Sequence, residues 1–364
     1  MKLGIIFGGK SVEHDISLIT ASQIMACLKE SKYELIPLYI QSDGKIVVTE
    51  KFLSQKDLKD KRIKFSKNSE KRFKGKNWAY FKEKMRPDVM LPAVHGKFLE
   101  SGEVYGLCKT LGIPYTFSGN LASSISQSKI YTKKVLENIK LNVLNYVSFS
   151  KEEFYEKKDE FIEKIRKLSY PVVIKANELG SSIGLYVGND EKETISGIEK
   201  SFLYDKYVLV ERKVSNFLEL NCAYLRTYDK KIVSSVDEVR NNNKIYSFED
   251  KYEENRLEHI IPANISLELE EEIKETTRRI GEEINAYGVI RVDYIYDLDE
   301  NVLYVNEINS IPGAYAYYLF ENQGIYFDEL LEYLIEGAIK REYFDSKLIH
   351  FHESNVLEVG KNKN

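Results

Sequence analysis

Four polar residues near the C-terminal end have types and spacing that could bind a metal ion. Arg291 and Asp293 lie two apart in one segment, and Glu307 and Asn309 lie two apart in another. Residues two apart on a β-strand project from the same face, so antiparallel pairing would gather a guanidinium, two carboxylates and an amide. Carboxylate and amide oxygens, completed by substrate phosphates, suit Mg2+, and the arginine suits a developing negative charge. An ordinary hairpin with a solvated polar face is the alternative.

A hairpin must position these side chains, and the surrounding sequence fits one. Residues 289–296 and 302–308 alternate apolar and polar side chains, and the turn-forming stretch 297–301 separates them. The second strand runs directly into Ser-Ile-Pro-Gly at 310–313. This tight turn would hold the backbone rigidly beside the acidic residues.

The N-terminal segment predicts a strand, a glycine loop, a helix and a second strand. Residues 2–7 and 33–40 are the apolar strands, and residues 16–28 have helical periodicity. This βαβ order indicates a parallel sheet, whose ligands usually lie at the carboxyl ends of the strands. Glu13 lies in the loop or the first helical turn, where an acid favours the helix dipole. The same carboxylate would also suit an ammonium group in the crevice.

A second glycine loop lies in the middle of the chain. The predicted strand at 170–175 ends in Lys175, and the loop at 177–184 contains Ser181 and Ser182. Backbone N–H groups and hydroxyls in such a loop can bind phosphates, although an ordinary flexible hairpin has the same composition. Lys129, on a predicted helix at 121–137, fits either a solvated surface or a phosphate site.

The length, composition and net charge of the chain exclude several classes of protein. The 364 residues are 43% hydrophobic, which is enough for two or three domains with real cores. A formal net charge of -4 implies no general affinity for nucleic acid or anionic membrane, and no apolar run is long enough to span a bilayer. The first residues lead directly into a strand, and the three cysteines form no C-x-x-C pair. We therefore expect a cytoplasmic protein.

The order and spacing of these motifs resemble the D-alanine–D-alanine ligases of the ATP-grasp superfamily over about residues 2–339. The resemblance is carried by G-G-K-S-V-E-H-D-I-S-L from residue 8, P-V-V-I-K-A-N-E-L-G-S-S-I-G from 171, V-L-V-E-R from 208 and R-V-D…N-E-I-N-S-I-P-G from 291. It implies an α/β and α+β architecture with the ATP-grasp fold. The expected parts are an N-terminal α/β domain at 1–117, a lid subdomain at 118–210, a catalytic subdomain at 211–346 and a polar tail at 347–364.

The resemblance also implies a role for each candidate residue. Residues implied to bind ATP are Lys129, Lys175, Ser181, Ser182, Glu211, Glu219 and Lys251. Residues implied to hold Mg2+ or Mn2+ are Asp293, Glu307 and Asn309. Residues implied to act in catalysis are Glu13, which holds the first ammonium, Ser181, which ties the lid loop closed, Tyr252, in a water-excluding loop, and Arg291 with the Gly313 backbone, which stabilise the oxyanion.

The reaction implied by the resemblance joins two amino acids through an acyl phosphate. ATP phosphorylates the first carboxylate, and the amine of the second amino acid attacks the acyl phosphate. The expected enzyme is a D-alanine–D-alanine ligase for peptidoglycan precursor synthesis, with ATP and Mg2+ as cofactors and small amino acids as substrates. The resemblance to this family also implies a homodimer.

The chain departs from the family pattern after the turn at 310–313. A Ser-His-Ser segment is common there, and its last serine binds the second substrate's carboxylate. This chain has Tyr318 in that place, within an expected acceptor pocket of Tyr317, Tyr318 and Leu319. Two alternatives therefore stay open: a ligase with another acceptor, such as D-serine, D-lactate or another amino acid, and a non-catalytic ATP-binding module.

Overall fold

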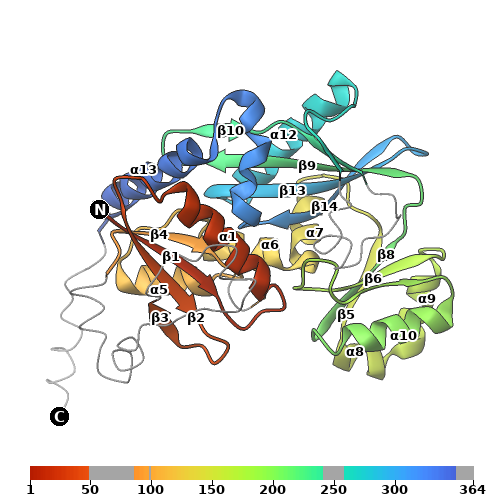
Figure 1. Cartoon of the computed structure of the whole chain (residues 1–364). Coiled ribbons are helices and arrows are strands. Elements are labelled where there is room, and N and C mark those ends of the chain that lie inside the picture. The colour runs from red at the N-terminus through yellow and green to blue at the C-terminus, as the bar shows by residue number, and fades with distance from the viewer. Residues whose placement is uncertain (49–85, 98–99, 241–257, 350–364) are drawn as a thin grey trace, which may run out of the picture.

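The computed structural model describes residues 1–48, 86–97, 100–240 and 258–349. These residues form three β-sheets, each covered by helices (Figure 1). Lys251, Tyr252 and residues 350–364 of the predicted tail lie outside the described residues. The expected mixture of a parallel-sheet domain with α+β parts is confirmed by this arrangement.

The N-terminal sheet contains the predicted βαβ unit. Its strands have the order β3-β2-β1-β4, and β1 pairs in parallel with both β2 and β4. Helix α1 connects β1 to β2 and packs on β1. The bounds are β1 Lys2–Gly8, α1 His14–Cys27, β2 Glu34–Ile40, β3 Ile46–Val48, β4 Val89–Ala93 and α5 Glu103–Leu111. Strand β1 is an almost continuous buried run, as expected for a strand in a parallel sheet.

The middle sheet is antiparallel and has the order β5-β8-β6-β7. Three helices bury their apolar stripes against it, with Phe154, Phe161 and Ile198 in one shared core. The bounds are β5 Tyr146–Ser150, α8 Lys151–Glu156, α9 Lys158–Arg166, β6 Val172–Ala176, β7 Leu185–Gly188, α10 Glu191–Ser201 and β8 Tyr207–Arg212. Figure 1 shows this unit standing apart from the rest at one end of the molecule.

The largest sheet has the order β12-β11-β9-β13-β14, with β10 also paired to β9. The bounds of its strands are β9 Phe217–Arg226, β10 Lys231–Val233, β11 Asp237–Arg240, β12 Glu258–Ile260, β13 Gly288–Asp297 and β14 Val302–Asn309. The remaining elements are α6 Asn120–Gln127, α7 Lys129–Asn138, α12 Leu267–Glu283, η1 Gly313–Leu319, η2 Glu321–Gln323 and α13 Phe327–Asp345. Helices α6, α7 and α12 supply Ala122, Leu136 and Ile273 to the core of this sheet.

The packing of these cores differs from the predicted domain boundaries. Helices α6 and α7, placed by sequence with the lid, pack against the largest sheet. The expected boundary after residue 210 falls inside β8, which continues to Arg212. Helix α13, placed by sequence with the catalytic part, contributes Leu330 and Leu334 to the N-terminal core. A helix with one apolar stripe does not specify which sheet it covers, so these assignments needed the tertiary structure.

Candidate active site

The predicted hairpin is confirmed, and its register brings the four polar residues together. Strands β13 and β14 are antiparallel, with Arg291 opposite Asn309 and Asp293 opposite Glu307. The Arg291 guanidinium contacts the Asp293 carboxylate twice, through Nε at 2.7 Å and Nη2 at 2.8 Å. Asn309 Nδ2 donates to Asp293 Oδ2 at 3.1 Å. A simple solvated polar face is therefore excluded, because Asp293 is buried within this network.

A β-bulge in the hairpin adds a residue that the alternation did not reveal. The register shifts after Asp293, so that Tyr294 faces Val305 and Asn306 is the extra residue. Bulges redirect side chains and often lie beside active sites. The Asn306 side chain accepts a hydrogen bond from Lys175 Nζ at 2.9 Å. The hairpin thus contacts the middle sheet through Asn306, which directly precedes the predicted metal ligand Glu307.

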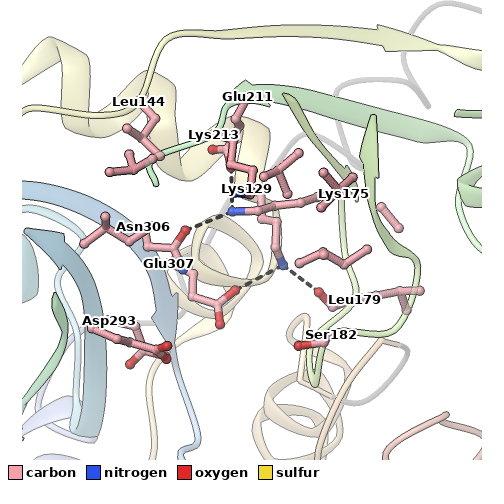
Figure 2. A pocket seen from close by; sticks show the side chains of 18 of the residues that line it. Lys129, Leu144, Lys175, Leu179, Ser182, Glu211, Lys213, Asp293, Asn306 and Glu307 are labelled. Atoms are coloured by element: carbon pink, nitrogen blue, oxygen red, sulfur yellow. Dashed lines mark hydrogen bonds and ion pairs between the residues drawn. The ribbon is translucent and has the colours of Figure 1, made fainter. Parts of the chain in front are cut away.

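A smaller cavity, of about 150 Å3, lies between the middle and largest sheets. The predicted ATP-binding residues of the described chain all line it: Lys129, Lys175, Ser181, Ser182, Glu211 and Glu219. Figure 2 shows two lysine side chains reaching into this space from different elements. Lys129 Nζ lies 3.3 Å from Glu307 Oε2 and donates to the Leu179 carbonyl at 2.5 Å. The solvated-surface alternative for Lys129 is therefore wrong.

Glu211 is held by two ammonium groups at the inner end of the smaller cavity. Its carboxylate lies 2.5 Å from Lys175 Nζ and 2.6 Å from Lys133 Nζ. Burial alone would raise its pKa, but the two lysines overcome burial and lower the pKa to about 2. Lys133 lies one helical turn beyond Lys129 and is fully buried, and no role was predicted for it from the sequence.

The glycine and serine loop between β6 and β7 reaches the N-terminal domain. Ser181 Oγ donates to Glu13 Oε1 at 2.5 Å, and Glu13 is the N-cap residue of α1. A Cβ at Gly180 would lie 3.0 Å from Glu13 Oε1, so glycine permits this close approach. Ser181 and Ser182 have positive φ angles of 53° and 58°, which is costly for residues other than glycine. Two such residues in succession, closed by a hydrogen bond from the Ile183 N–H to the Gly180 carbonyl at 3.0 Å, form a tight hairpin turn, so the contact of Ser181 with Glu13, and not the turn itself, favours a functional loop.

A larger cavity, of about 450 Å3, adjoins the smaller one. Glu13, Arg291, Gly313, Tyr317 and Tyr318 all line it. Leu319 does not. Its side chain is fully buried in the N-terminal hydrophobic core, so its predicted place in the acceptor pocket is wrong. The η1 turn that presents the two tyrosines to the cavity points the next side chain inward, which sequence spacing could not show.

Two buried groups beside the larger cavity were not predicted as functional. His95 is hydrogen-bonded to Thr20 Oγ1 at 2.9 Å, and burial, with a further contribution from Arg291, lowers its pKa to about 4. Glu100 accepts from the Ile311 N–H at 2.9 Å, and burial, together with the charge of Glu13, raises its pKa to about 7. Both residues belong to the segment H-G-K-F-L-E that follows β4. A buried strand that ends in His-Gly was the signal available in the sequence.

The metal-binding potential of the site lies in two carboxylates and one amide. Within the described residues, no group of three or more His, Cys, Asp and Glu side chains is placed to hold a metal ion. Asp293 and Glu307 are instead neutralised by Arg291 and Lys129.

Across the same described ranges, no helix is long and apolar enough to cross a membrane.

Two family models match the sequence and together span most of the chain. The model described as D-ala D-ala ligase N-terminus matches residues 2–118. The model described as D-ala D-ala ligase C-terminus matches residues 135–336. Among curated proteins, D-alanine–D-alanine ligase B of Clostridium tetani is 35% identical over 348 residues, covering 94% of both chains. D-alanine–D-alanine ligase of Caldicellulosiruptor bescii is 37% identical over 358 residues, covering 94% of this chain and 96% of the relative.

Solved structures have the same fold. The VanG D-Ala:D-Ser ligase from Enterococcus faecalis superposes with a TM-score of 0.74 at 25% identity, covering 93% of this chain and 99% of that one. The D-alanine–D-alanine ligase from Bacillus anthracis complexed with ATP superposes with a TM-score of 0.70 at 24% identity, covering 95% and 99%. The ATP-grasp fold expected from the sequence is thereby confirmed.

Proposed function

Because this chain belongs to the D-alanine–D-alanine ligase family, we propose that it is an ATP-dependent ligase that joins D-alanine to a second D-alanine for peptidoglycan precursor synthesis. One observation carries the proposal. The smaller and larger cavities share part of their walls, and the shared residues are Lys129, Leu179, Gly180, Ser181, Glu219, Asp293 and Glu307. A nucleotide in the smaller cavity would therefore direct its γ-phosphate toward an amino acid in the larger one.

We assign Mg2+, or Mn2+ in its place, to Asp293, Glu307 and Asn309. The two carboxylates face each other across the hairpin, and the amide lies beside them. Mg2+ is usually bound by one or two carboxylates and completed by substrate phosphates and water, so a site without a third carboxylate fits this ion. A metal held by these three side chains would offset the negative charge of the phosphates.

The protein's own residues would organise the first half of the reaction. Glu13 would hold the ammonium group of the first amino acid, so that its carboxylate faces the γ-phosphate. The carboxylate oxygen then bonds to phosphorus, and the bond to the ADP oxygen breaks. Lys129 and Lys175, whose ammonium groups lie in the smaller cavity, would stabilise the transferring phosphates.

In the second half, the neutral amine of the second amino acid attacks the acyl carbon. The carbonyl oxygen becomes an oxyanion, which the Arg291 guanidinium and the Gly313 N–H would stabilise. Arginine has five N–H donors, and its bonds to Asp293 use Nε and Nη2. Collapse of the intermediate breaks the bond to phosphate, the attacking nitrogen loses one proton to the departing phosphate or to water, and the peptide bond remains. The Ser181–Glu13 bond would keep the lid loop closed and exclude water from the acyl phosphate.

A related ligase with a different acceptor is the second candidate. Tyr318 lines the larger cavity where the family commonly has a serine, and a phenol fills much more of the pocket. The 25% identity to a D-Ala:D-Ser ligase makes D-serine an acceptor to test, beside D-lactate and other amino acids. A non-catalytic ATP-binding module is disfavoured, because nucleotide binding alone does not need an arginine in the amino-acid cavity.

The test is phosphate release from Mg-ATP with D-alanine as the sole amino acid, with the product identified by mass. We expect D-alanyl-D-alanine. Turnover only when a second compound is added would support the alternative acceptor and identify it. ATP binding without phosphate release for any pair of substrates would overturn the ligase proposal.

We propose in addition that the enzyme is a cytoplasmic homodimer, as the family's habit suggests. Light scattering on the purified full chain would measure its mass in solution. A mass of one chain, 42.3 kDa, across the working concentration range would overturn the dimer. Fractionation of cells that express the chain would test its location.

A further inference from the structure

A histidine that the sequence did not single out lines the larger cavity beside Tyr318. His259 lies on β12, and its ring contacts the Tyr318 ring edge to face, with centroids 5.6 Å apart and an interplanar angle of 65°. Both side chains line the larger cavity. The His259 side chain is 41% exposed, so a small molecule in the cavity could reach it.

A buried aspartate orients the His259 ring. Strand β11 pairs with β12, and Asp237 on β11 accepts a hydrogen bond from His259 Nδ1 at 2.7 Å. Asp237 is fully buried, so its carboxylate is fixed and holds the imidazole in one orientation. Nδ1 is therefore committed to the protein, and Nε2 is the nitrogen available to a ligand.

Among the described residues that line the larger cavity, two basic side chains lie beside Tyr318, namely His259 and Arg291. Lys129 lies toward the smaller cavity against Glu307, and Arg291 is paired with Asp293. The pKa of His95 is lowered to about 4, which keeps that ring neutral at pH 7.

The pKa of His259 is shifted the other way. Its hydrogen bond to Asp237 raises it, burial and Arg291 oppose that change, and Glu219 adds to it. The neighbouring Tyr318 keeps its proton, because burial raises the pKa of the phenol. The imidazole and the phenolic O–H thus lie side by side, and a protonated imidazole with a phenol is a suitable pair of donors for a carboxylate.

We propose that His259, oriented by Asp237, binds the carboxylate of the second substrate together with Tyr318 and so selects acceptors that carry a carboxylate next to their nucleophile. This inference rests on the proposed ligase function and adds a specificity residue to it. It also explains how the acceptor pocket works with a tyrosine at position 318, since His259 supplies a charge that the phenol lacks.

The test is a competition between two acceptors in one reaction. D-alanine and D-alaninamide are mixed with Mg-ATP, and the two products are counted by mass. The amide has no carboxylate to activate, so it serves only as acceptor, and the product ratio reports acceptor choice independently of ATP and donor binding. We expect His259→Gln to reduce the preference for the acid by about 10-fold or more, as for loss of a charged hydrogen bond.

Two variants separate a binding role from a structural one. His259→Lys keeps a cation and should retain much of the preference for the acid. Asp237→Asn keeps the imidazole but removes its orienting carboxylate, and should lower the preference in the same direction as His259→Gln. Glu258→Gln changes the neighbouring exposed residue of the same strand and should leave the ratio unchanged. Thermal midpoints would identify any variant that is not folded.

The outcomes distinguish this inference from the ligase proposal. An unchanged product ratio in His259→Gln, beside an active wild type, would overturn the role of His259 and leave the ligase function standing. Absence of turnover in the wild type with every acceptor would overturn both. If the wild type uses another acceptor, the same competition is run with that acid and its amide, and the same change in ratio is expected.

Discussion

At the scale of single residues, charge compensation dominates the site. Asp293 and Glu307 each face a cation, Arg291 and Lys129 respectively, so these side chains together carry no large excess of negative charge. In the proposed reaction, the two carboxylates would bind the metal ion in place of these cations. Lys129 would then bind phosphate, and Arg291 would bind the oxyanion. The carboxylates are therefore the residues at which a neutral substitution should be most damaging.

Glu307→Gln should abolish most turnover while the protein stays folded. The amide keeps the size of the side chain but loses the charge that the metal and Lys129 both need, so we expect kcat to fall by at least about 100-fold. Phosphate release measures the effect. Glu321→Gln, at an exposed glutamate of η2, is the matched control and should remain active, since Glu321 lines neither the smaller nor the larger cavity. Near-normal activity of Glu307→Gln would refute the metal assignment.

Glu100 should make stability depend on pH in a predictable direction. Its pKa is raised in the folded protein from 4.5 to about 7, so the folded state holds a proton that the unfolded state has lost between these values. The stabilisation is complete below about pH 4.5 and is lost as the pH rises through about 7. Relative to Glu100→Gln, the wild type should lose about 3 kcal/mol across this window.

Urea unfolding of both proteins at several pH values would measure this difference. The pKa of His95 is shifted downward, which gives the opposite pH dependence, but His95 is present in both proteins and cancels in the comparison. A stability difference that stays constant from pH 4.5 to 7.5 would contradict the shifted pKa of Glu100.

At the scale of secondary-structure elements, one buried ion-pair cluster joins three of them. Lys133 on α7, Lys175 on β6 and Glu211 on β8 meet at the inner end of the smaller cavity. Helix α7 belongs to the core of the largest sheet, whereas β6 and β8 belong to the middle sheet. The cluster therefore joins the middle sheet to the largest sheet at the place where a nucleotide would bind.

Lys133→Met should destabilise the protein much more than a neighbouring substitution. It leaves the buried Glu211 with one cation in place of two, and breaking a buried pair costs about 3 kcal/mol. Lys134→Met is the control, because Lys134 is exposed on the same helix and should change stability by less than about 0.5 kcal/mol. Urea unfolding compares the two variants. Equal stabilities would mean that the cluster contributes nothing to the fold.

At the scale of the whole molecule, the middle sheet and its loops contact the N-terminal domain as well as the largest sheet. Ser181 bonds to Glu13, and Lys97 lies 2.8 Å from Glu178 Oε2 and 3.1 Å from Asp205 Oδ2. Asp205 is buried, and the Lys97 side chain is only 18% exposed, so this ion pair is shielded from solvent. Both contacts join the middle sheet to the N-terminal domain, and the Ser181–Glu13 bond lies in the wall of the larger cavity.

Lys97→Met should weaken this junction and let water reach the acyl phosphate. We expect the phosphate released per dipeptide formed to rise above one, and KM for ATP to rise by about 3- to 10-fold, as for loss of a partly buried ion pair. Lys29→Met, an exposed lysine on the N-terminal domain, is the control. A phosphate-to-dipeptide ratio that stays at one would show that this ion pair does not gate water.

The sequence by itself determined the parts of the protein that depend on local patterns. Alternation predicted the hairpin and the shared face of Arg291 and Asp293, and the strand, glycine loop and helix order predicted the N-terminal parallel sheet. These patterns work because strand and helix periods fix which nearby side chains share a face. The order of the motifs then identified the family.

Only the tertiary structure decided which distant segments meet. It placed Leu319 in the core and buried Lys133 against Glu211. It inserted Asn306 into a bulge of the hairpin. It also set His259 beside Asp237 and Tyr318. It also assigned α6 and α7 to the largest sheet. Each of these facts depends on pairing between segments far apart in the chain, and a local period specifies a face without specifying what packs against it.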